Sequence, residues 1–120
     1  MGWQVRDPRR KAHDSEGEVQ AAVLIAVGSL EGAHFWRNNT GAFHDGKRLI
    51  RYGQVGSADV LGCYRGRFVA IECKARRGRL SADQRAWRSA VVAAGGVYIV
   101  AKGASADDAA FDVLIELEKI

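Results

Sequence analysis

Apolar residues recur at intervals of three and four from residue 15 to about residue 30, and this spacing predicts an amphipathic helix. Ser15 and Glu18 have the spacing of a capping box, in which two side chains satisfy backbone N–H groups at a helix start. One side of this helix should therefore lie against the core, through Val19, Ala22, Val23, Ala26, Val27 and Leu30.

Two further helices are expected in the second half of the chain. Ser81, followed three residues later by Gln84, has the position of an N-cap, and the glycine pair at residues 95–96 should end that helix. Its core-facing stripe is predicted to be Ala86, Trp87, Ala90, Val91 and Ala94. The last helix should start after Ser105 and run to the end of the chain, carrying Phe111, Leu114, Ile115 and Glu118.

Short runs of β-branched and aromatic residues predict strands between these helices. One strand is expected over residues 33–38, and two more should be joined by a tight turn near residues 64–66. Residues 97–101 contain no charge, as expected for a buried central strand. Residues 39–57 contain four glycines and predict either a hairpin or an extended loop, in which residues 48–52 are the most strand-like.

The order of these elements predicts an α/β fold. The strand before the middle helix and the strand after it should form a right-handed, parallel β-α-β unit, while the earlier strands pair antiparallel. We therefore expect a mixed central sheet flanked by helices on both faces, an αβββαβ core followed by a C-terminal helix. The chain of 120 residues suits one domain, over residues 15–120, preceded by a basic N-terminal arm over residues 1–14.

Composition excludes several classes of protein. No apolar run approaches the roughly 18 residues of a membrane span, and the charged N-terminus lacks the apolar stretch of a signal peptide, so an intracellular, cytoplasmic protein is expected. Two cysteines cannot form a disulfide framework, and the three histidines are too scattered for a zinc site.

Positive charge gathers in two places, within a net charge of +4. One is the N-terminal arm, and the other follows the strand at residues 67–75. Such clusters are often solvated surface, but a basic balance also favours a polyanionic partner through phosphate contacts. The candidate phosphate-binding residues are Arg10, Lys11, Arg76, Arg77 and Arg79.

The strand at residues 67–75 carries two charged residues where apolar ones are expected. Glu72 and Lys74 share one face of the strand, because side chains alternate between faces. An exposed ion pair, worth at most about 1 kcal/mol, is the plain explanation. Asp59, however, should fall almost opposite Glu72 in the antiparallel pair, so two carboxylates and an ammonium group can converge.

Two facing carboxylates beside a lysine suit a hard divalent cation such as Mg²⁺, which takes one or two carboxylates, several waters and substrate phosphates. Such a site can hydrolyse a phosphodiester, because the metal polarises the phosphoryl oxygen and lowers the pKa of a bound water. Lys74 would orient that water or neutralise developing charge. The backbone carbonyl of Cys73 could add a further metal ligand.

These residues resemble a known family. "GSADV" followed by "AIECK" resembles the PD-(D/E)XK nuclease signature, and the wider set "RNNTGAF", "RYGQVGSADVLG", "GRFVAIECKARRGRLSADQRAWRSAVVAAGG" and "VYIVA" is similar to the stand-alone VRR-NUC nucleases of phage and bacteria. The resemblance implies a restriction-endonuclease-like fold, Mg²⁺ or Mn²⁺ bound by Asp59 and Glu72, and charge stabilisation by Lys74. It also places Glu18 and Gln84 near the metal, although both residues have a competing explanation as helix caps.

The expected function is a metal-dependent DNA endonuclease, selective for DNA structure in the manner of a Holliday-junction resolvase. The alternatives are a nucleic-acid-binding module without strong activity, or a nuclease for flaps, nicks or linear duplex. No phosphate-cradling glycine motif supports a nucleotide-binding protein. A symmetric homodimer is expected, because paired cuts need two sites. Five aromatic residues either anchor its interface or fill the core beneath the 39–57 segment: Trp3, Phe35, Trp36, Phe43 and Tyr52.

Overall fold

The computed structural model describes residues 13–120. The candidate DNA-binding residues Arg10 and Lys11, and the aromatic Trp3, lie outside the described residues. Asp14, at the end of the predicted arm, accepts a hydrogen bond of 2.7 Å from the Ala106 backbone N–H, so the chain is already joined to the domain at that point.

Three helices and six strands make up the described chain. In order they are α1 (Glu16–Gly28), β1 (Ala33–Arg37), β2 (Gly41–His44), β3 (Leu49–Tyr52), β4 (Val60–Tyr64), β5 (Arg67–Cys73), α2 (Ala82–Ala93), β6 (Val97–Ala101) and α3 (Ala106–Glu118). None of the helices in residues 13–120 is long and apolar enough to cross a membrane.

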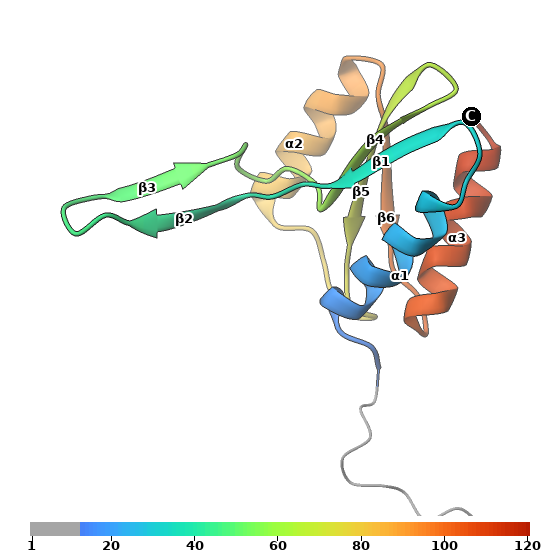
Figure 1. Cartoon of the computed structure of the whole chain (residues 1–120), viewed down its shortest axis with the longest axis horizontal. Coiled ribbons are helices and arrows are strands. Elements are labelled where there is room, and N and C mark those ends of the chain that lie inside the picture. The colour runs from blue at the N-terminus through green and yellow to red at the C-terminus, as the bar shows by residue number, and fades with distance from the viewer. Residues whose placement is uncertain (1–12) are drawn as a thin grey trace, which may run out of the picture.

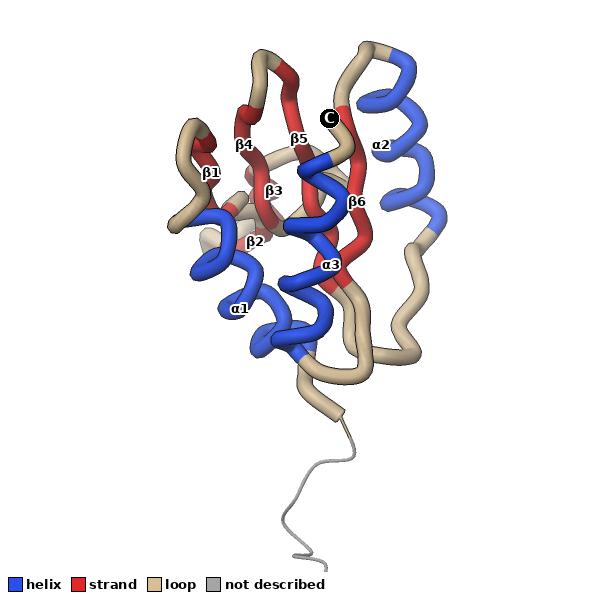
Figure 2. The backbone as a smooth tube through the Cα atoms, turned by 90° about the vertical axis from the view of Figure 1, so that its right-hand side faces the viewer, coloured by secondary structure: helices blue, strands red, loops and turns tan. Residues whose placement is uncertain are grey.

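Four of the strands form one mixed sheet in the order β1-β4-β5-β6. The pairs β1–β4 and β4–β5 are antiparallel, whereas β5 and β6 are parallel on either side of the α2 connection. Figures 1 and 2 show α1 and α3 together on one face of the sheet and α2 on the other. The predicted α/β class, with a mixed sheet between helices, is confirmed.

The core lies between the sheet and the pair α1–α3. Helix α1 buries the predicted stripe Val19, Val23 and Val27 against the sheet. The strands contribute residues that alternate along β4 and β5, and α3 contributes one face: Val60, Val69, Ile71, Ala109, Val113 and Leu117. Among the described residues, α2 is the helix that covers the opposite face of the sheet (Figures 1 and 2).

That uneven coverage makes two sequence predictions wrong. Strand β6 was predicted to be central, but it lies at one edge of the four-stranded sheet, where Val100 is 37% exposed. The inner strands are β4 and β5. The α2 stripe is not a core stripe either, since no residue of α2 is buried. Of the predicted stripe, Trp87 and Val91 are half-buried and the three alanines are exposed. A single helix beside a sheet edge has no second helix to cover its flank.

Strands β2 and β3 form a separate two-stranded sheet, the β2–β3 hairpin, which projects away from the body (Figure 1). The hairpin alternative for residues 39–57 is therefore the one observed. Phe43 and Tyr52 are exposed on it, and Trp36 is exposed on β1, so the expectation that these aromatic residues fill the core is wrong. Phe35 is half-buried and packs against the core.

Helix α3 provides a direct test of which side holds the fold together. Leu117 is 1% exposed and Phe111 is 62% exposed on the same helix. We expect Leu117→Ala to lower the free energy of unfolding by about 2–5 kcal/mol, because it leaves a cavity in the core. Phe111→Ala should change it by no more than about 0.5 kcal/mol. Urea unfolding of the two variants measures both values, and equal losses would contradict the described packing.

Candidate functional site

Asp59 and Glu72 lie side by side at one end of the sheet. The β4–β5 register pairs Val60 with Ile71, so Asp59, one residue before β4, is the neighbour of Glu72 on the face covered by α2. Asp59 Oδ2 accepts a 2.8 Å hydrogen bond from the Cys73 backbone N–H, which fixes the carboxylate against β5. The predicted convergence of the two carboxylates is what the structure shows.

The chain entering Asp59 is held in place by Asn38. The Asn38 backbone N–H donates to the Asp59 carbonyl oxygen at 2.7 Å. The Asn38 side-chain amide donates to Ser57 Oγ and to the Ala58 carbonyl oxygen, both at 2.8 Å. The position of Asp59 therefore depends on the end of β1 as well as on β5.

Glu72 is a buried carboxylate that the protein leaves partly unsatisfied. Glu72 is 2% exposed, its Oε1 accepts from Gln84 Nε2 at 3.3 Å, and within residues 13–120 its buried Oε2 has no hydrogen-bond donor. Burial, the adjacent Asp59 charge and a proton shared with the Asp59 carboxylate raise the pKa of Glu72 to about 8, against the opposing effect of Lys74. Two carboxylates held side by side with one of them buried are unfavourable unless one stays protonated or a cation compensates them, and a bound cation would displace the Glu72 proton.

Lys74 supplies positive charge but does not close the site. It is 8% exposed, and its Nζ lies 4.0 Å from Glu72 Oε1 and 3.9 Å from Glu16 Oε1. Both distances are at the outer limit of an ion pair, so the ammonium group lies between two carboxylates without a short bond to either. Lys74 therefore places one positive charge beside Glu72, and its ammonium group can still donate hydrogen bonds to a further group.

Gln84 acts both as a helix cap and as a neighbour of the site. Its Oε1 accepts from the Ser81 backbone N–H at 2.8 Å, completing the capping box of α2, while its Nε2 donates to Glu72. Gly56 approaches the Asp83 carbonyl so closely that a Cβ on Gly56 would clash with it. The turn at residues 53–57 therefore packs against the first turn of α2. The two interpretations of Gln84 are therefore not exclusive.

Helix α1 brings Glu16 to the site. The predicted Glu18 completes the capping box with Ser15, whose backbone N–H and hydroxyl donate to Glu18 Oε1 at 3.2 and 3.0 Å. Glu16, two residues earlier, is the α1 carboxylate paired with Lys74, and its charge also contributes to the raised pKa of Glu72. No sequence pattern distinguishes Glu16 from Glu18, the other acidic residue of the first turn of α1.

Cys73 and Tyr98 flank the same carboxylates from different sides. The Cys73 side chain is buried in the core, where burial raises the pKa of its thiol, so only its backbone is available to the site. Tyr98 of β6 has a buried hydroxyl with no hydrogen-bond partner, and burial followed by the Glu72 charge raises the pKa of Tyr98. Tyr98 is a site neighbour that sequence reasoning missed.

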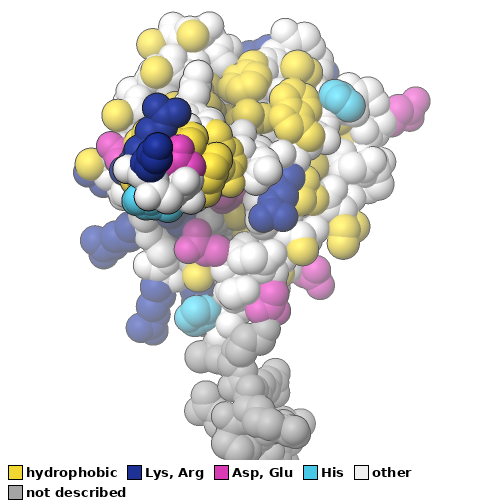
Figure 3. All heavy atoms as spheres, turned by 60° about the vertical axis from the view of Figure 1, so that its left-hand side comes forward, with side chains coloured by type: hydrophobic (Ala, Val, Ile, Leu, Met, Phe, Trp, Pro, Cys, Tyr) yellow, Lys and Arg dark blue, Asp and Glu magenta, His cyan; other side chains and the backbone are white. Residues whose placement is uncertain are grey.

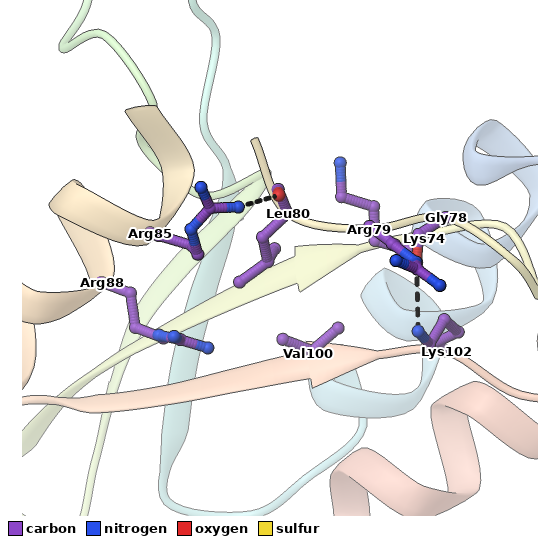
Figure 4. Close-up of a pocket in the computed structure, with 8 residues that line it drawn as sticks. All are labelled: Lys74, Gly78, Arg79, Leu80, Arg85, Arg88, Val100 and Lys102. Carbon is purple, nitrogen blue, oxygen red and sulfur yellow. Dashed lines mark hydrogen bonds between the residues drawn. The ribbon is translucent and has the colours of Figure 1, made fainter. Parts of the chain in front are cut away.

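A basic pocket opens next to Lys74 (Figure 4). It has a volume of about 470 Å³ and is lined by cations from the end of β5, the following loop, α2 and the end of β6: Lys74, Arg79, Arg85, Arg88 and Lys102. Backbone carbonyls orient two of them, since Arg85 donates to Leu80 at 2.8 Å and Lys102 donates to Gly78 at 3.0 Å.

Only part of this pocket was predicted. Of the three arginines predicted to contact phosphate, Arg79 lines this pocket, whereas Arg76 and Arg77 are exposed residues of the same loop and do not line it. Arg85, Arg88 and Lys102 were missed. The spacing of Arg85 and Arg88, one helical turn apart directly after Gln84, was a usable signal, because residues at i and i+3 share a helix face.

The donor set fits a divalent cation. Within residues 13–120 no three His, Cys, Asp or Glu side chains are gathered as a ready-made metal cage. Mg²⁺ does not require one, since it usually takes one or two protein carboxylates and completes its shell with water and phosphate. The unpartnered Glu72 Oε2 beside Asp59 is the observation in favour.

Comparison with known proteins adds no family assignment: no family model matches the chain, and no curated protein matches it significantly.

The buried carboxylate predicts an unusual dependence of stability on pH. In metal-free solution we expect the free energy of unfolding to fall as the pH rises from about 5 to about 8. The folded protein keeps the Glu72 proton up to its raised pKa of about 8, whereas the unfolded chain releases it near 4.5, so rising pH favours the unfolded chain.

Urea unfolding across this pH range, with a chelator present, measures the effect. Glu72→Gln has no proton to release and should remove most of the decline. A decline of equal size in the wild type and in Glu72→Gln would show that another group is responsible.

Proposed function

We propose that this protein is a Mg²⁺- or Mn²⁺-dependent nuclease, with a PD-(D/E)XK-type core, that hydrolyses phosphodiester bonds in DNA. The observation that supports it most is the buried Glu72 beside the half-buried Asp59: Glu72 Oε1 lies 4.0 Å from Lys74 Nζ, and Glu72 Oε2 has no hydrogen-bond donor within residues 13–120. The basic pocket beside this pair provides the second requirement of a nuclease, because clustered cations bind the phosphates of a nucleic acid backbone.

Each residue of the site would have a separate part in hydrolysis. Asp59 and Glu72 would hold the metal, which when bound polarises the phosphoryl oxygen and activates a water. The Cys73 N–H and the Gln84 amide each hold one oxygen of these carboxylates, which leaves the other oxygen for a metal. Lys74 would orient the water or neutralise the charge that develops on the phosphate.

Selectivity for DNA structure is the form of recognition that this surface favours. Lysine and arginine contacts to phosphate position a duplex without reading its bases, so the path of the backbone decides what binds. We therefore propose branched DNA, such as a four-way junction, as the substrate. Flaps, nicks and linear duplex are the alternative substrates, and a binding module without cleavage is the alternative function.

A homodimer would supply the two sites that paired cuts require. The surface we propose for it is the apolar groove beside α2, of about 420 Å³, where α2 and β5 leave apolar side chains uncovered. It is lined by Gln54, Phe68, Trp87, Ala90, Val91, Ala94 and Gly96. A cytoplasmic location belongs to the same proposal.

Cleavage of a panel of branched and linear DNAs tests the proposed activity. We expect wild-type cleavage that requires Mg²⁺ or Mn²⁺ and is lost in Asp59→Asn, Glu72→Gln and Lys74→Ala. Mg²⁺ should also raise the melting temperature of the wild type, since a ligand of the folded state stabilises it. It should not raise that of Glu72→Gln, because the metal site is then incomplete.

Two results would count against this function. Cleavage by Glu72→Gln at the wild-type rate would show that the activity belongs to another site or to a contaminant. Tight DNA binding by a wild type that cuts none of the panel with either metal would favour the binding module.

Variants of Gln84 and Ser81 distinguish the two roles of Gln84, which are to position Glu72 and to cap α2. Ser81→Ala and Gln84→Ala both break the capping box of α2 and should each cost about 1 kcal/mol of stability. Only Gln84→Ala removes the hydrogen bond to Glu72, so only it should lower the single-turnover rate per folded molecule. Thermal melting measured beside single-turnover cleavage compares the two, and equal rates in both variants would leave Gln84 as a cap alone.

A further inference from the structure

The β2–β3 hairpin has no structural task within its own chain. Its strands pair only with each other, and apart from the half-buried Ile50 every residue from Gly41 to Tyr52 is exposed. Figure 3, in which the hairpin comes forward, shows basic side chains gathered at its tip. An isolated two-stranded hairpin is at best marginally stable in water, so a hairpin whose strands pair with no other strand of residues 13–120 suggests a function outside the chain.

One face of the hairpin stiffens it from within. The register places Phe43 opposite Ile50 and Gly41 opposite Tyr52 on this face. The Phe43 and Tyr52 rings lie 6.4 Å apart, and Tyr52 crosses Gly41 so closely that a Cβ there would be 2.5 Å from the Tyr52 Oη. The two exposed aromatic side chains therefore pack against each other across the two strands.

The tip is a preformed turn that carries positive charge. The Asp45 carboxylate accepts from the Lys47 and Arg48 backbone N–H groups, both at 2.9 Å, and Gly46 adopts the positive φ of 93° that the turn needs. Asp45 also pairs with the Arg48 side chain at 3.5 Å. Within residues 13–120 neither Lys47 nor Arg51 has an ion-pair partner, so the hairpin presents three cations against one carboxylate.

The base of the hairpin is anchored at the candidate site. Its first strand follows Asn38, whose backbone and side chain hold the residues up to Asp59. Its second strand leads to Gln54, whose Oε1 accepts from the Trp87 indole N–H of α2 at 2.8 Å. The hairpin therefore leaves the sheet beside the two carboxylates, and about eight extended residues carry its tip roughly 25 Å away.

We propose that the β2–β3 hairpin lies in the major groove of the DNA duplex leading away from the cut site. This inference rests on the proposed nuclease function. A two-stranded ribbon fits the major groove, which is about 12 Å wide. Lys47, Arg48 and Arg51 then contact phosphates at its edges, while the carboxylate pair contacts the scissile phosphate. A second copy of this chain is a poorer occupant, because it would bring the same excess of cations to the same place.

A charge-neutralised hairpin tests the proposal. The triple variant Lys47→Ala, Arg48→Ala, Arg51→Ala removes three charges from a hairpin that packs on nothing, so its melting temperature should match the wild type. The control is Arg65→Ala, Arg67→Ala, Lys119→Ala, which removes the same charge at the opposite end of the sheet. Because Arg65 and Arg67 donate hydrogen bonds to backbone carbonyls, the melting temperature of the control is measured too and its binding is compared well below that temperature. Binding is measured in Ca²⁺ over a range of salt concentrations, and cleavage in Mg²⁺.

We expect the hairpin variant to bind a long-armed substrate about tenfold more weakly, with the salt slope reduced by about one unit per lost contact. The control should bind like the wild type. The difference should vanish on a substrate whose duplex ends within about seven base pairs of the cut, since a tip 25 Å away then finds no phosphates.

The possible failures are distinguishable. If the wild type cuts with metal but the hairpin variant keeps its affinity and salt slope, the hairpin proposal is overturned and the nuclease stands. If the hairpin variant binds weakly as expected but the wild type never cuts, the nuclease fails and the hairpin stands as a DNA-binding element. A hairpin variant whose mass by light scattering differs from the wild type, without DNA, would identify the hairpin as a protein interface and overturn the proposal.

Discussion

The register between β4 and β5 is the constraint on which the rest of the site depends. Because Val60 pairs with Ile71, Asp59 comes to lie next to Glu72 on the face of α2. A shift of one residue would move every side chain of the strand to the other face, exposing Ile71 and burying charge in the α1–α3 core. The apolar residues of the core and the tight turn at Arg65 and Gly66, both with positive φ, therefore keep the two carboxylates together.

Placing Glu72 and Lys74 beneath α2 has a cost that the remaining fold must offset. Buried charges lose hydration, and here neither forms a short ion pair with the other. The opposite face of the sheet offsets this cost, since its residues from α1, β5 and α3 pack with almost no exposure. One face of the sheet thus provides most of the stability, while the other holds the polar atoms Glu72 Oε2 and Tyr98 Oη without hydrogen-bond partners among residues 13–120.

The lone helix on the second face has consequences beyond the site. Because α2 covers only the β6 side of the sheet, it leaves a basic pocket at one end and an apolar groove along its flank. The same incomplete coverage lets the chain between β1 and β4 leave the sheet as a hairpin instead of packing on it. The carboxylate pair, the basic pocket and the base of the hairpin all lie at the end of the sheet where β1 and β5 end and β4 begins.

The local parts of this arrangement were determined by the sequence. Alternation of side chains and a tight turn predicted the strand pair, and hence that Asp59 and Glu72 are neighbours, because both signals act within fifteen residues of chain. Helix starts were equally readable, since the capping boxes at Ser15 and Ser81 involve residues three apart. The order of helices and strands also follows from local patterns along the chain, and this order predicted the α/β class.

Only the tertiary structure decided what packing brings together from a distance. Five residues near the site come from α1, from α2 and from β6 with the residue that follows it. Their contacts depend on how these elements pack and not on spacing along the chain: Glu16, Arg85, Arg88, Tyr98 and Lys102. The periodicity of α2 predicted a buried stripe, but burial depends on whether a second layer covers that stripe, and residues 13–120 supply none. Gln84 could not be assigned to cap or site from sequence, because one end of its amide completes the helix cap and the other binds Glu72.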